Sequence, residues 1–555
     1  MEQIKQSENL GMEQIIKNKG KLSIQWPLTI VTVGLLLFVV FFLALKPDET
    51  VGVINTLFSA TMSGAGPFLL LLDVVFIVIC FGLAFSRYGK IKLGAGKPQF
   101  SMFSYIAMMA CAALASASMF WSFTEWSYYC VTPGLGIVPF TREAMEISMG
   151  YAFFHWGLLA QCVYVIIGVV TAYALYVRKM NTMSMSLIAE EMMGNFKFKK
   201  PVGRLIDLLV VFCTLGGLSV SLGLGIPVIA GGVHRVTGLE VNFPMQVGIV
   251  LVLGVIFSLS SFVGTAKGMK FLSDNTVKLL MVLVGFIFIF GPTSFIQKLF
   301  VSSLGYMVEY MPRMATFTDP ILNGGFAESW TIFFIAFPMT YAGLMGVFVA
   351  KISRGRSIKS LVLSCMFGIS VGTWVFFAVN GGLAMHREIT GQFSLIDVVQ
   401  NGDAYGAIFK ILDTLPLGGV LAVVYTIVVV GFICTTLDTA SLALASTTTK
   451  GLDKDNNPSA VTRLFWCVML TLIPLALMFS GASFNALKSL AILVSTPLAI
   501  VLLFLIIGLF KWIKEDRKTP GMLRFVEDDM VDFGICYDEV ELECEEIIIE
   551  SEVEV

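Results

Sequence analysis

The sequence is poor in charged residues, which make up only 14% of its 555 residues; a typical soluble domain carries about 25%. It has three histidines, and its ten cysteines form no Cys-x-x-Cys pair. These shortages disfavour a zinc site and a disulfide framework, and also the paired haem ligation of a membrane redox subunit. Neither HExxH nor GxxxxGK[ST] occurs, so an enzyme is disfavoured. The net charge of −2 gives no support for a nucleic-acid partner.

Long apolar runs are what the chain has in excess. Hydrophobic residues reach 56%, and the mean hydropathy is +0.84. Because about 20 consecutive apolar residues cross a bilayer, twelve such runs predict an all-α integral membrane protein. The predicted spans are 24–45, 66–86, 101–125, 148–176, 205–232, 243–264, 276–296, 329–350, 359–380, 410–449, 461–482 and 485–512. The segment 410–449 is expected to include a loop before its helix.

Basic residues gather in alternate loops between these runs. Lysine and arginine are frequent in 87–97, 178–204, 267–270, 351–359 and 450–463, and the other loops hold fewer. The positive-inside rule places the basic loops and both termini in the cytoplasm. The expected location is therefore the inner (plasma) membrane of the cell, crossed many times. The polar N-terminal segment does not have the pattern of a secretory signal.

One membrane domain with two short appendages is expected. Residues 1–23 form a cytoplasmic N-terminal segment, and 24–513 form the membrane domain. Within it, 297–328 holds an amphipathic helix and a loop at the outer surface. Residues 514–555 form a cytoplasmic tail with thirteen acidic and no basic residues from Glu527 onward, a pattern typical of a solvated segment. Such a tail leaves open a transporter-like sensor whose output is the tail.

Two predicted spans are unlike the others. The span 329–350 holds a proline and two glycines, and the span 101–125 holds the small-residue run CAALASAS, which allows close packing or local unwinding. Helix breakers at membrane depth are tolerated where the backbone lines a cavity, and transporters bind substrates at such breaks. The two spans stand five apart, which predicts a five-plus-five inverted repeat opened in each half by a discontinuous helix.

Aromatic residues concentrate near these segments, in FWSFTEWSYY, FFHWGLLAQCVY and SWTIFFIAFPMTY. Aromatic faces around a cavity suit a cation, above all a quaternary ammonium. The alternative is an aromatic girdle at the bilayer surface. For Trp126 and Trp330, which lie near the ends of their spans, the sequence favours neither the cavity nor the girdle. Glu125 is an ionisable group inside a span and therefore a functional candidate. Its alternative is a helix-end residue at the outer interface.

A hydroxyl cluster, ICTTLDTAS, lies in the tenth span. Thr435, Thr436 and Asp438 offer the hard oxygen ligands that alkali cations prefer. The alternative is hydrogen bonding between helices, which such residues provide in membrane proteins generally. The cluster is thus a candidate site for a coupling ion.

Several motifs together resemble the betaine/carnitine/choline transporter (BCCT) family, and most closely its carnitine transporters. They are YMPRMATFTDPILNGGF, ESWTIFF, VFVAKISRGRSIK, FFHWG and YVRKM, and the likeness runs from about residue 25 to about residue 512. The resemblance implies a leucine-transporter-type inverted-repeat fold with two extra N-terminal helices. It also implies a homotrimer in the lipid bilayer, a trimethylammonium substrate, and no cofactor other than transported Na⁺.

The resemblance further implies which residues bind the substrate. By position, the central aromatic box and its neighbours fall on Tyr128, Trp156, Gln161, Tyr164, Phe337, Pro338, Tyr341 and Met345, with Trp330 in an outer, transient site. The family's carnitine transporters have tryptophan where this chain has Gln161, Phe337 and Pro338. The expected site is therefore thinner and more polar. A longer, bulkier, hydroxylated or demethylated betaine could fit it.

Coupling follows from the same resemblance. The sodium-independent exchangers of the family share Met345 but carry an arginine at the position of Thr276, and they lack the paired hydroxyls Thr435 and Thr436. We therefore expect alternating-access symport of carnitine, γ-butyrobetaine or another betaine with sodium. The alternative is sodium-independent substrate/product exchange, which an inward-facing Lys270 or Lys278 would favour.

Overall fold

Helices make up most of the part of the protein that the structure describes. The computed structural model describes residues 23–263, 270–401, 404–450, 458–479 and 484–526. Its elements are β1 Ser23–Ile24, α2 Trp26–Leu45, α3 Pro47–Phe85, η1 Arg87–Lys90, α4 Met102–Val131, α5 Arg142–Trp156, α6 Leu158–Tyr176, α7 Met185–Met192, α8 Lys199–Thr237, α9 Phe243–Val263, α10 Lys270–Phe290, α11 Thr293–Thr316, η3 Ala327–Thr331, α12 Ile332–Thr340, α13 Ala342–Ile352, α14 Ile358–Leu363, η4 Ser364–Ile369, α15 Ser370–Ile389, α16 Leu395–Asn401, α17 Ala404–Leu412, α18 Gly418–Thr448, β2 Thr449–Lys450, α19 Ala460–Phe479 and α20 Phe484–Asp516.

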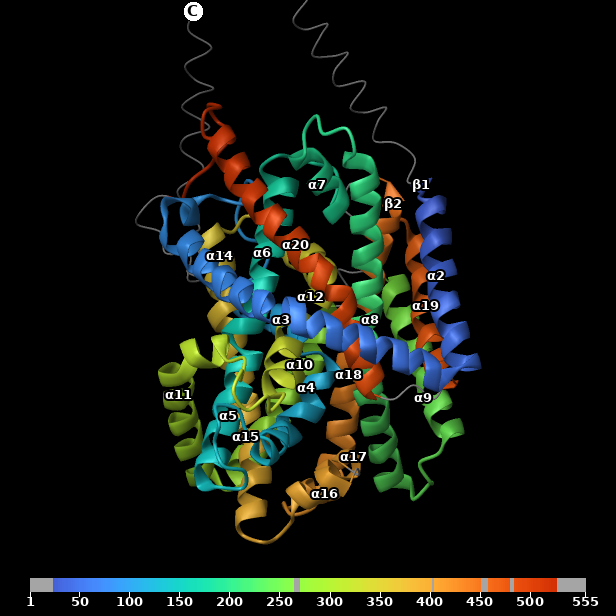
Figure 1. Cartoon of the computed structure of the whole chain (residues 1–555), viewed down its shortest axis with the longest axis vertical. Helices are drawn as coiled ribbons and strands as arrows, with labels where there is room; N and C mark the ends of the chain where they lie inside the picture. Colours follow the sequence, from blue (N-terminus) through green and yellow to red (C-terminus); the bar gives the residue numbers. More distant parts are fainter. Residues whose placement is uncertain (1–22, 264–269, 402–403, 451–457, 480–483, 527–555) are drawn as a thin grey trace, which may run out of the picture.

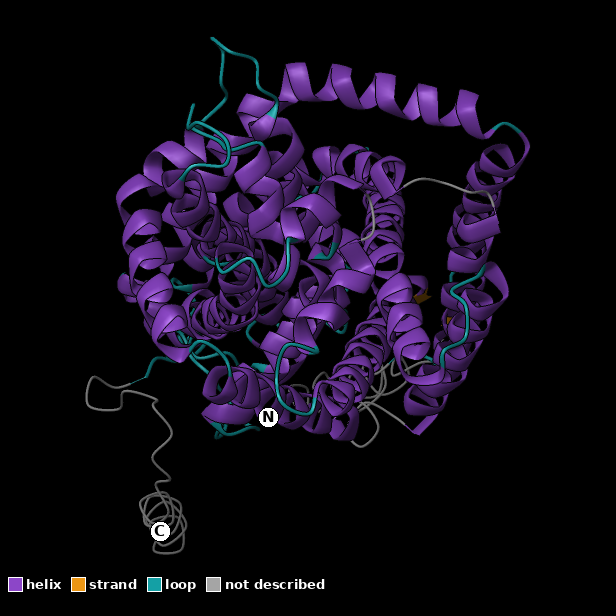
Figure 2. Ribbon diagram, turned by 90° about the horizontal axis from the view of Figure 1, so that it is seen from below, coloured by secondary structure: helices purple, strands orange, loops and turns teal. Residues whose placement is uncertain are grey.

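Most of the long helices lie side by side in a bundle, and α3 runs across it (Figures 1 and 2). A helix overlaps each of the twelve predicted ranges. Counted over the described residues, eight helices are long and apolar enough to cross a membrane, and the bent pair α12–α13 makes a ninth. Lipid offers no hydrogen-bond partners for the backbone, and a helix pairs its own backbone N–H and C=O groups. The chain is therefore an all-α integral membrane protein. As predicted, a loop precedes the tenth span, because α17 ends at Leu412 and α18 begins at Gly418.

The predicted discontinuity in the third span is wrong. The backbone of α4 is helical without a break from Met102 to Val131. Alanine is the strongest helix former, so the run CAALASAS does not force the helix to unwind. The side chains of 111–116 lie outside the described residues. The interruption lies instead inside 148–176, which the sequence analysis treated as one span and the structure divides into α5 and α6.

Gly157 forms the break between α5 and α6. Its backbone has φ −96° and ψ −128°, outside the helical region. A Cβ at this position would lie 2.6 Å from the indole nitrogen of Trp374, so no larger residue fits. The same indole N–H donates to the carbonyl of Phe153, one turn before the break, at 2.8 Å. The interruption is therefore fixed by α15.

The eighth span is broken as the sequence predicts. Helices α12 and α13 meet at Tyr341 with a bend of 55°. Pro338, inside α12, has no backbone N–H and disturbs the regular ladder. Beyond the break, a Cβ on Gly343 would lie 2.5 Å from Cγ1 of Val210. Glycine therefore lets α13 pack closely on α8.

The predicted amphipathic helix is α11, which begins a little before the predicted range 297–328. From Ile296 to Met307 every third or fourth residue is buried, and Met314 and Ala315 are buried near its end; the first group is Ile296, Leu299, Ser303 and Met307. This face packs on α5 and α15, and α11 lies along the side of the bundle in Figure 1.

Both ends of the described chain lie at one end of the molecule, at the top of Figure 1. Strand β1 pairs with β2, the segment that follows α18. The loop at 90–92 pairs with 524–526 on one edge and with 356–358 on the other. Basic loops predicted to share one side thus touch each other. Residues 1–22 and the acidic residues 527–555 lie outside the described residues.

Candidate functional site

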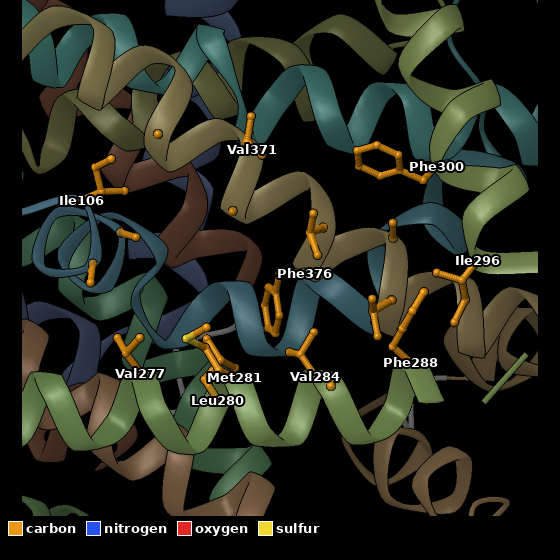
Figure 3. A pocket seen from close by; sticks show the side chains of 18 of the residues that line it. Ile106, Val277, Leu280, Met281, Val284, Phe288, Ile296, Phe300, Val371 and Phe376 are labelled. Atoms are coloured by element: carbon orange, nitrogen blue, oxygen red, sulfur yellow. The ribbon is translucent and has the colours of Figure 1, made fainter. Parts of the chain in front are cut away.

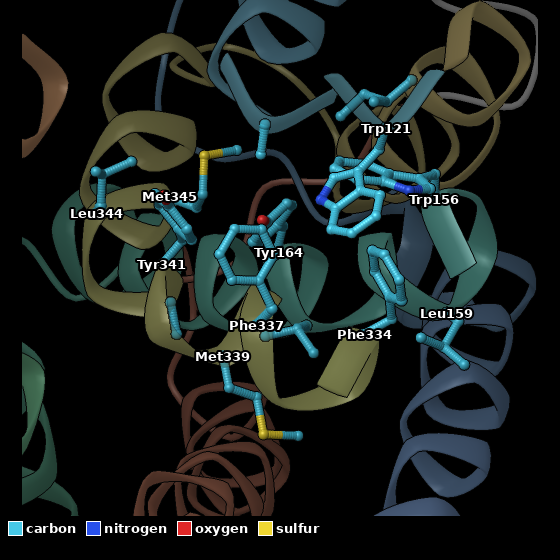
Figure 4. Packing of buried hydrophobic residues seen from close by; sticks show 14 of the residues in the cluster. Trp121, Trp156, Leu159, Tyr164, Phe334, Phe337, Met339, Tyr341, Leu344 and Met345 are labelled. Carbon is cyan, nitrogen blue, oxygen red and sulfur yellow. The ribbon is translucent and has the colours of Figure 1, made fainter. Parts of the chain in front are cut away.

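Aromatic rings gather where α5, α6 and the broken pair α12–α13 meet (Figure 4). Trp156 packs on Phe334 with ring centroids 5.4 Å apart, and Phe337 packs on Tyr341 at 5.3 Å. Tyr164 of α6 lies beside Phe337 and Tyr341 in Figure 4. Four of the residues predicted to bind substrate are therefore brought together. We call Trp156, Tyr164, Phe337 and Tyr341 the inner cluster.

Tyr128 belongs to a second group of rings. Its ring centroid lies 5.6 Å from that of Trp330 and 5.6 Å from that of Trp121. The ring contacts thus group Tyr128 with the predicted outer residue Trp330. Trp330 is 9% exposed and Trp126 only 1% exposed. Neither can belong to an aromatic girdle at the bilayer surface, because both are enclosed by protein.

Glu125 connects the inner cluster to the neighbouring residues of α4 and α5 by hydrogen bonds. One carboxylate oxygen accepts a hydrogen bond from the Trp156 indole at 2.6 Å, and the other accepts one from the Tyr129 hydroxyl at 2.6 Å. The Tyr129 hydroxyl lies 2.8 Å from Nδ1 of His155, whose Nε2 lies 3.2 Å from Oγ1 of Thr331. Glu125 is fully buried, which rules out the outer-interface alternative. The network joins α4 and α5 to η3, where the broken span begins.

Tyr129, His155 and Phe334 lie in the aromatic segments that the sequence singles out, but no role was predicted for them, and Thr331 was not predicted to belong to the site. Two signals were available. Tyr129 follows Glu125 by four residues, so both lie on one face of a helix. Phe334 precedes Phe337 by three residues and lies on the same face.

The break itself is anchored by the Tyr341 hydroxyl. It lies 2.6 Å from the Ser221 hydroxyl and donates to the Gly217 carbonyl at 2.9 Å, both on α8. The backbone N–H of Met345 donates to the Tyr341 carbonyl at 2.7 Å and begins the ladder of α13. Met345 is buried beside the inner cluster in Figure 4, and Pro338, which follows Phe337 in the chain, is also buried.

Gln161 lies in the first turn of α6 and is 3% exposed. Its Nε2 donates to the Trp156 carbonyl at 3.4 Å. Within the described part of the chain, its Oε1 has no hydrogen-bond partner.

The predicted ion ligands lie together on α18. The hydroxyl of Thr435 donates to the Gly431 carbonyl at 2.7 Å, and that of Thr436 donates to the Phe432 carbonyl at 2.9 Å. Each hydroxyl oxygen keeps lone pairs for a cation. Thr276 of α10 lies against the same helix, since a Cβ on Gly431 would be 2.2 Å from Oγ1 of Thr276.

Asp438 of the same cluster is paired with an arginine. It accepts a hydrogen bond from Arg463 of α19 at 3.1 Å and one from Ser260 of α9 at 2.8 Å. Each of its two oxygens therefore has a hydrogen-bond partner. Lys278 is exposed and does not point inward, and the side chain of Lys270 lies outside the described residues.

A hollow of about 760 Å³ lies elsewhere, among α4, α10, α11 and α15 (Figure 3). Its lining is apolar except for Gln297, and none of the predicted substrate residues contributes to it. A zwitterion would lose its hydration there and gain no polar partner.

A family model for betaine/carnitine/choline family transporters (BCCT) matches residues 27–518. The chain belongs to this family. It is 36% identical over 482 residues to a carnitine transporter of Acinetobacter baumannii, covering 87% of this chain and 88% of that one. It is 32% identical over 489 residues to an ectoine/hydroxyectoine transporter of Virgibacillus pantothenticus, with 87% and 96% covered.

A glycine betaine transporter of Bacillus subtilis is 30% identical over 502 residues, with 89% of this chain and 95% of that one covered. The BCCT protein described here is therefore a membrane transporter of a small molecule and not an enzyme.

Proposed function

We propose that the transporter carries a quaternary-ammonium zwitterion, such as carnitine, γ-butyrobetaine or another betaine, by alternating access. The observation that supports it most is the inner cluster, in which Trp156, Tyr164, Phe337 and Tyr341 converge on a helix break. A cation over such a ring gains about 0.5–2 kcal/mol per contact. Two of the relatives carry carnitine or glycine betaine by name, which favours the same class of substrate.

In this proposal the ammonium group lies against the inner cluster. Backbone N–H groups at the start of α13 meet the carboxylate, as a helix N-terminus favours an anion. Glu125 orients the Trp156 indole, and Pro338 and Met345 complete the wall. The proposed outer site, which the substrate occupies in passing, holds Trp330 and Tyr128. Rocking of one helix bundle against the rest exposes the site to each side in turn.

We propose sodium symport as the coupling mode, with Thr276, Thr435 and Thr436 as the oxygen ligands nearest the ion. Their grouping on α18 and α10 supports it. Sodium-independent exchange is the second candidate. The observation that favours it is the pair Arg463–Asp438, because a guanidinium held by the carboxylate of this cluster could take the place of an ion.

The wider architecture is also a proposal. It comprises twelve transmembrane helices in a five-plus-five inverted repeat, with α2 and α3 as the two extra helices and the membrane domain at 24–513. The protein forms a homotrimer in the plasma membrane, with both termini and the tail 514–555 in the cytoplasm. The contact of 90–92 with both 356–358 and 524–526 supports placing these segments on one side.

Uptake into proteoliposomes tests function and coupling together. Labelled carnitine, γ-butyrobetaine and glycine betaine are offered with and without an inward sodium gradient, and also to vesicles preloaded with unlabelled substrate. We expect concentrative uptake that disappears without sodium. Uptake that needs only preloaded substrate would establish exchange instead. Uptake of none of the three would overturn the substrate class.

A further inference from the structure

The amide of Gln161 has one satisfied end and one unsatisfied end. Nε2 donates to the Trp156 carbonyl at 3.4 Å, and Oε1 is a buried acceptor without a partner in the described residues. Exchanging the two ends would point Oε1 at the Trp156 carbonyl, and two acceptors cannot bond to each other. The chemistry therefore fixes the orientation of the amide. Its oxygen faces away from the carbonyl of Trp156.

Gln161 lies on the face of α6 that looks toward the broken span. It precedes Tyr164 by three residues, and such pairs share one face of a helix. One turn further on this face, a Cβ on Gly346 of α13 would lie 2.5 Å from Cγ1 of Ile167. Tyr164 itself lies beside Phe337 in Figure 4. Gln161 is therefore placed between Trp156 and Tyr164, at the inner cluster.

Within the described residues, no group of the inner cluster donates a hydrogen bond to this oxygen. The Trp156 indole N–H is already donated to Glu125 at 2.6 Å. The Tyr341 hydroxyl is held by α8, and Phe337 has no polar hydrogen. Buried acceptors in proteins are nearly always bonded, so the missing partner points to a group that arrives with the substrate.

A fully methylated ammonium cannot supply that group, since it carries no N–H. Resting on the proposed function, we infer that this transporter selects zwitterions with a hydrogen-bond donor next to the cationic nitrogen, and that Oε1 of Gln161 accepts that hydrogen bond. The donor is either an N–H of a less methylated ammonium or a hydroxyl on the carbon chain. The charge of the ammonium still lies against the rings of Trp156 and Phe337.

Two matched pairs of substrates show whether the donor is an ammonium N–H or a hydroxyl. Dimethylglycine differs from glycine betaine by one N–H in place of a methyl group, and carnitine differs from γ-butyrobetaine by one hydroxyl. Competition for uptake into proteoliposomes gives the ratio of kcat/KM within each pair. We expect the donor-bearing member of at least one pair to be favoured at least about tenfold, because a site built for a donor rejects the analogue without it.

Three variants test the role of Gln161. Gln161→Met keeps the length of the side chain and removes the acceptor, so the preference should fall to about onefold. Gln161→Glu keeps acceptor oxygens and should retain the preference. Cys162→Ser is the matched control, because the neighbouring Cys162 thiol faces Asp73 of α3, and it should leave the ratio unchanged.

The outcomes distinguish this inference from the function on which it rests. A ratio that is the same in the parent and in Gln161→Met, or no preference in the parent for either pair, overturns the inference alone. Uptake of none of the four compounds overturns the proposed function and this inference with it. Binding of the four compounds in detergent, measured as a shift in thermal unfolding, gives the ratio of Kd within each pair if a variant reconstitutes poorly.

Discussion

The inner cluster and the hydroxyl cluster of α18 differ in how far their polar atoms are already satisfied. At the inner cluster, the Gln161 oxygen has no partner within the described residues, and it lies beside a break in the chain. On α18, Thr435 and Thr436 bond to their own helix, and Asp438 holds Arg463. In the first region a buried acceptor has no donor in the described residues, whereas in the second the hydroxyl hydrogens and the Asp438 carboxylate have partners and the hydroxyl lone pairs are open to an ion. Substitutions should therefore change binding in the first region, and stability as well as coupling in the second.

The largest effect is expected from Arg463→Met. Removing the guanidinium leaves the fully buried Asp438 carboxylate without its cation, and breaking such a pair lowers the free energy of unfolding by about 3–5 kcal/mol. Thermal unfolding in detergent would measure the loss. The double variant Arg463→Met/Asp438→Asn should recover most of it, because no charge is then left unpaired. An unchanged midpoint for Arg463→Met would show that the pair does not stabilise this region.

A smaller effect, on binding, is expected from Trp156→Leu. Loss of one cation–π contact is worth about 0.5–2 kcal/mol, which is roughly a 2- to 30-fold weaker affinity for the preferred betaine. Binding in detergent, followed by tryptophan fluorescence or calorimetry, would measure it. Trp466→Leu is the control, since Trp466 is equally buried but bonds to Thr448 away from the inner cluster. Equal losses of affinity in the two variants would contradict the assignment.

An effect of comparable size, on ion coupling in place of substrate binding, is expected from Thr435→Ala and Thr436→Ala. Each removes one oxygen from the proposed sodium site, and the sodium concentration for half-maximal uptake should rise on the order of tenfold, equivalent to about 1.4 kcal/mol. Thr439→Ala is the control, because its hydroxyl donates to the Thr435 carbonyl one turn further on. Uptake that is independent of sodium in all three variants would favour exchange.

Several features that depend on residues close together in the sequence were predicted correctly. Apolar runs located the helices, and Pro338 located the bend of α12–α13, because a missing N–H acts on its own helix. The break at Gly157 was missed because its cause is distant, in the contact with Trp374. The third span was misjudged since small residues permit unwinding but do not require it. The bonds of Glu125 to Trp156 and of Asp438 to Arg463 join separate helices, and a single sequence contains no signal for such pairs.

The pairing of 90–92 with 524–526 also bears on how the protein is made. The loop at 90–92 is synthesised long before 524–526, its partner on one edge, and also before 356–358, its partner on the other. During translation it can therefore bond to 356–358 while the first edge is still open. A premature stop just before Arg524 would yield every helix that the structure describes and leave this one edge of the loop without its partner segment.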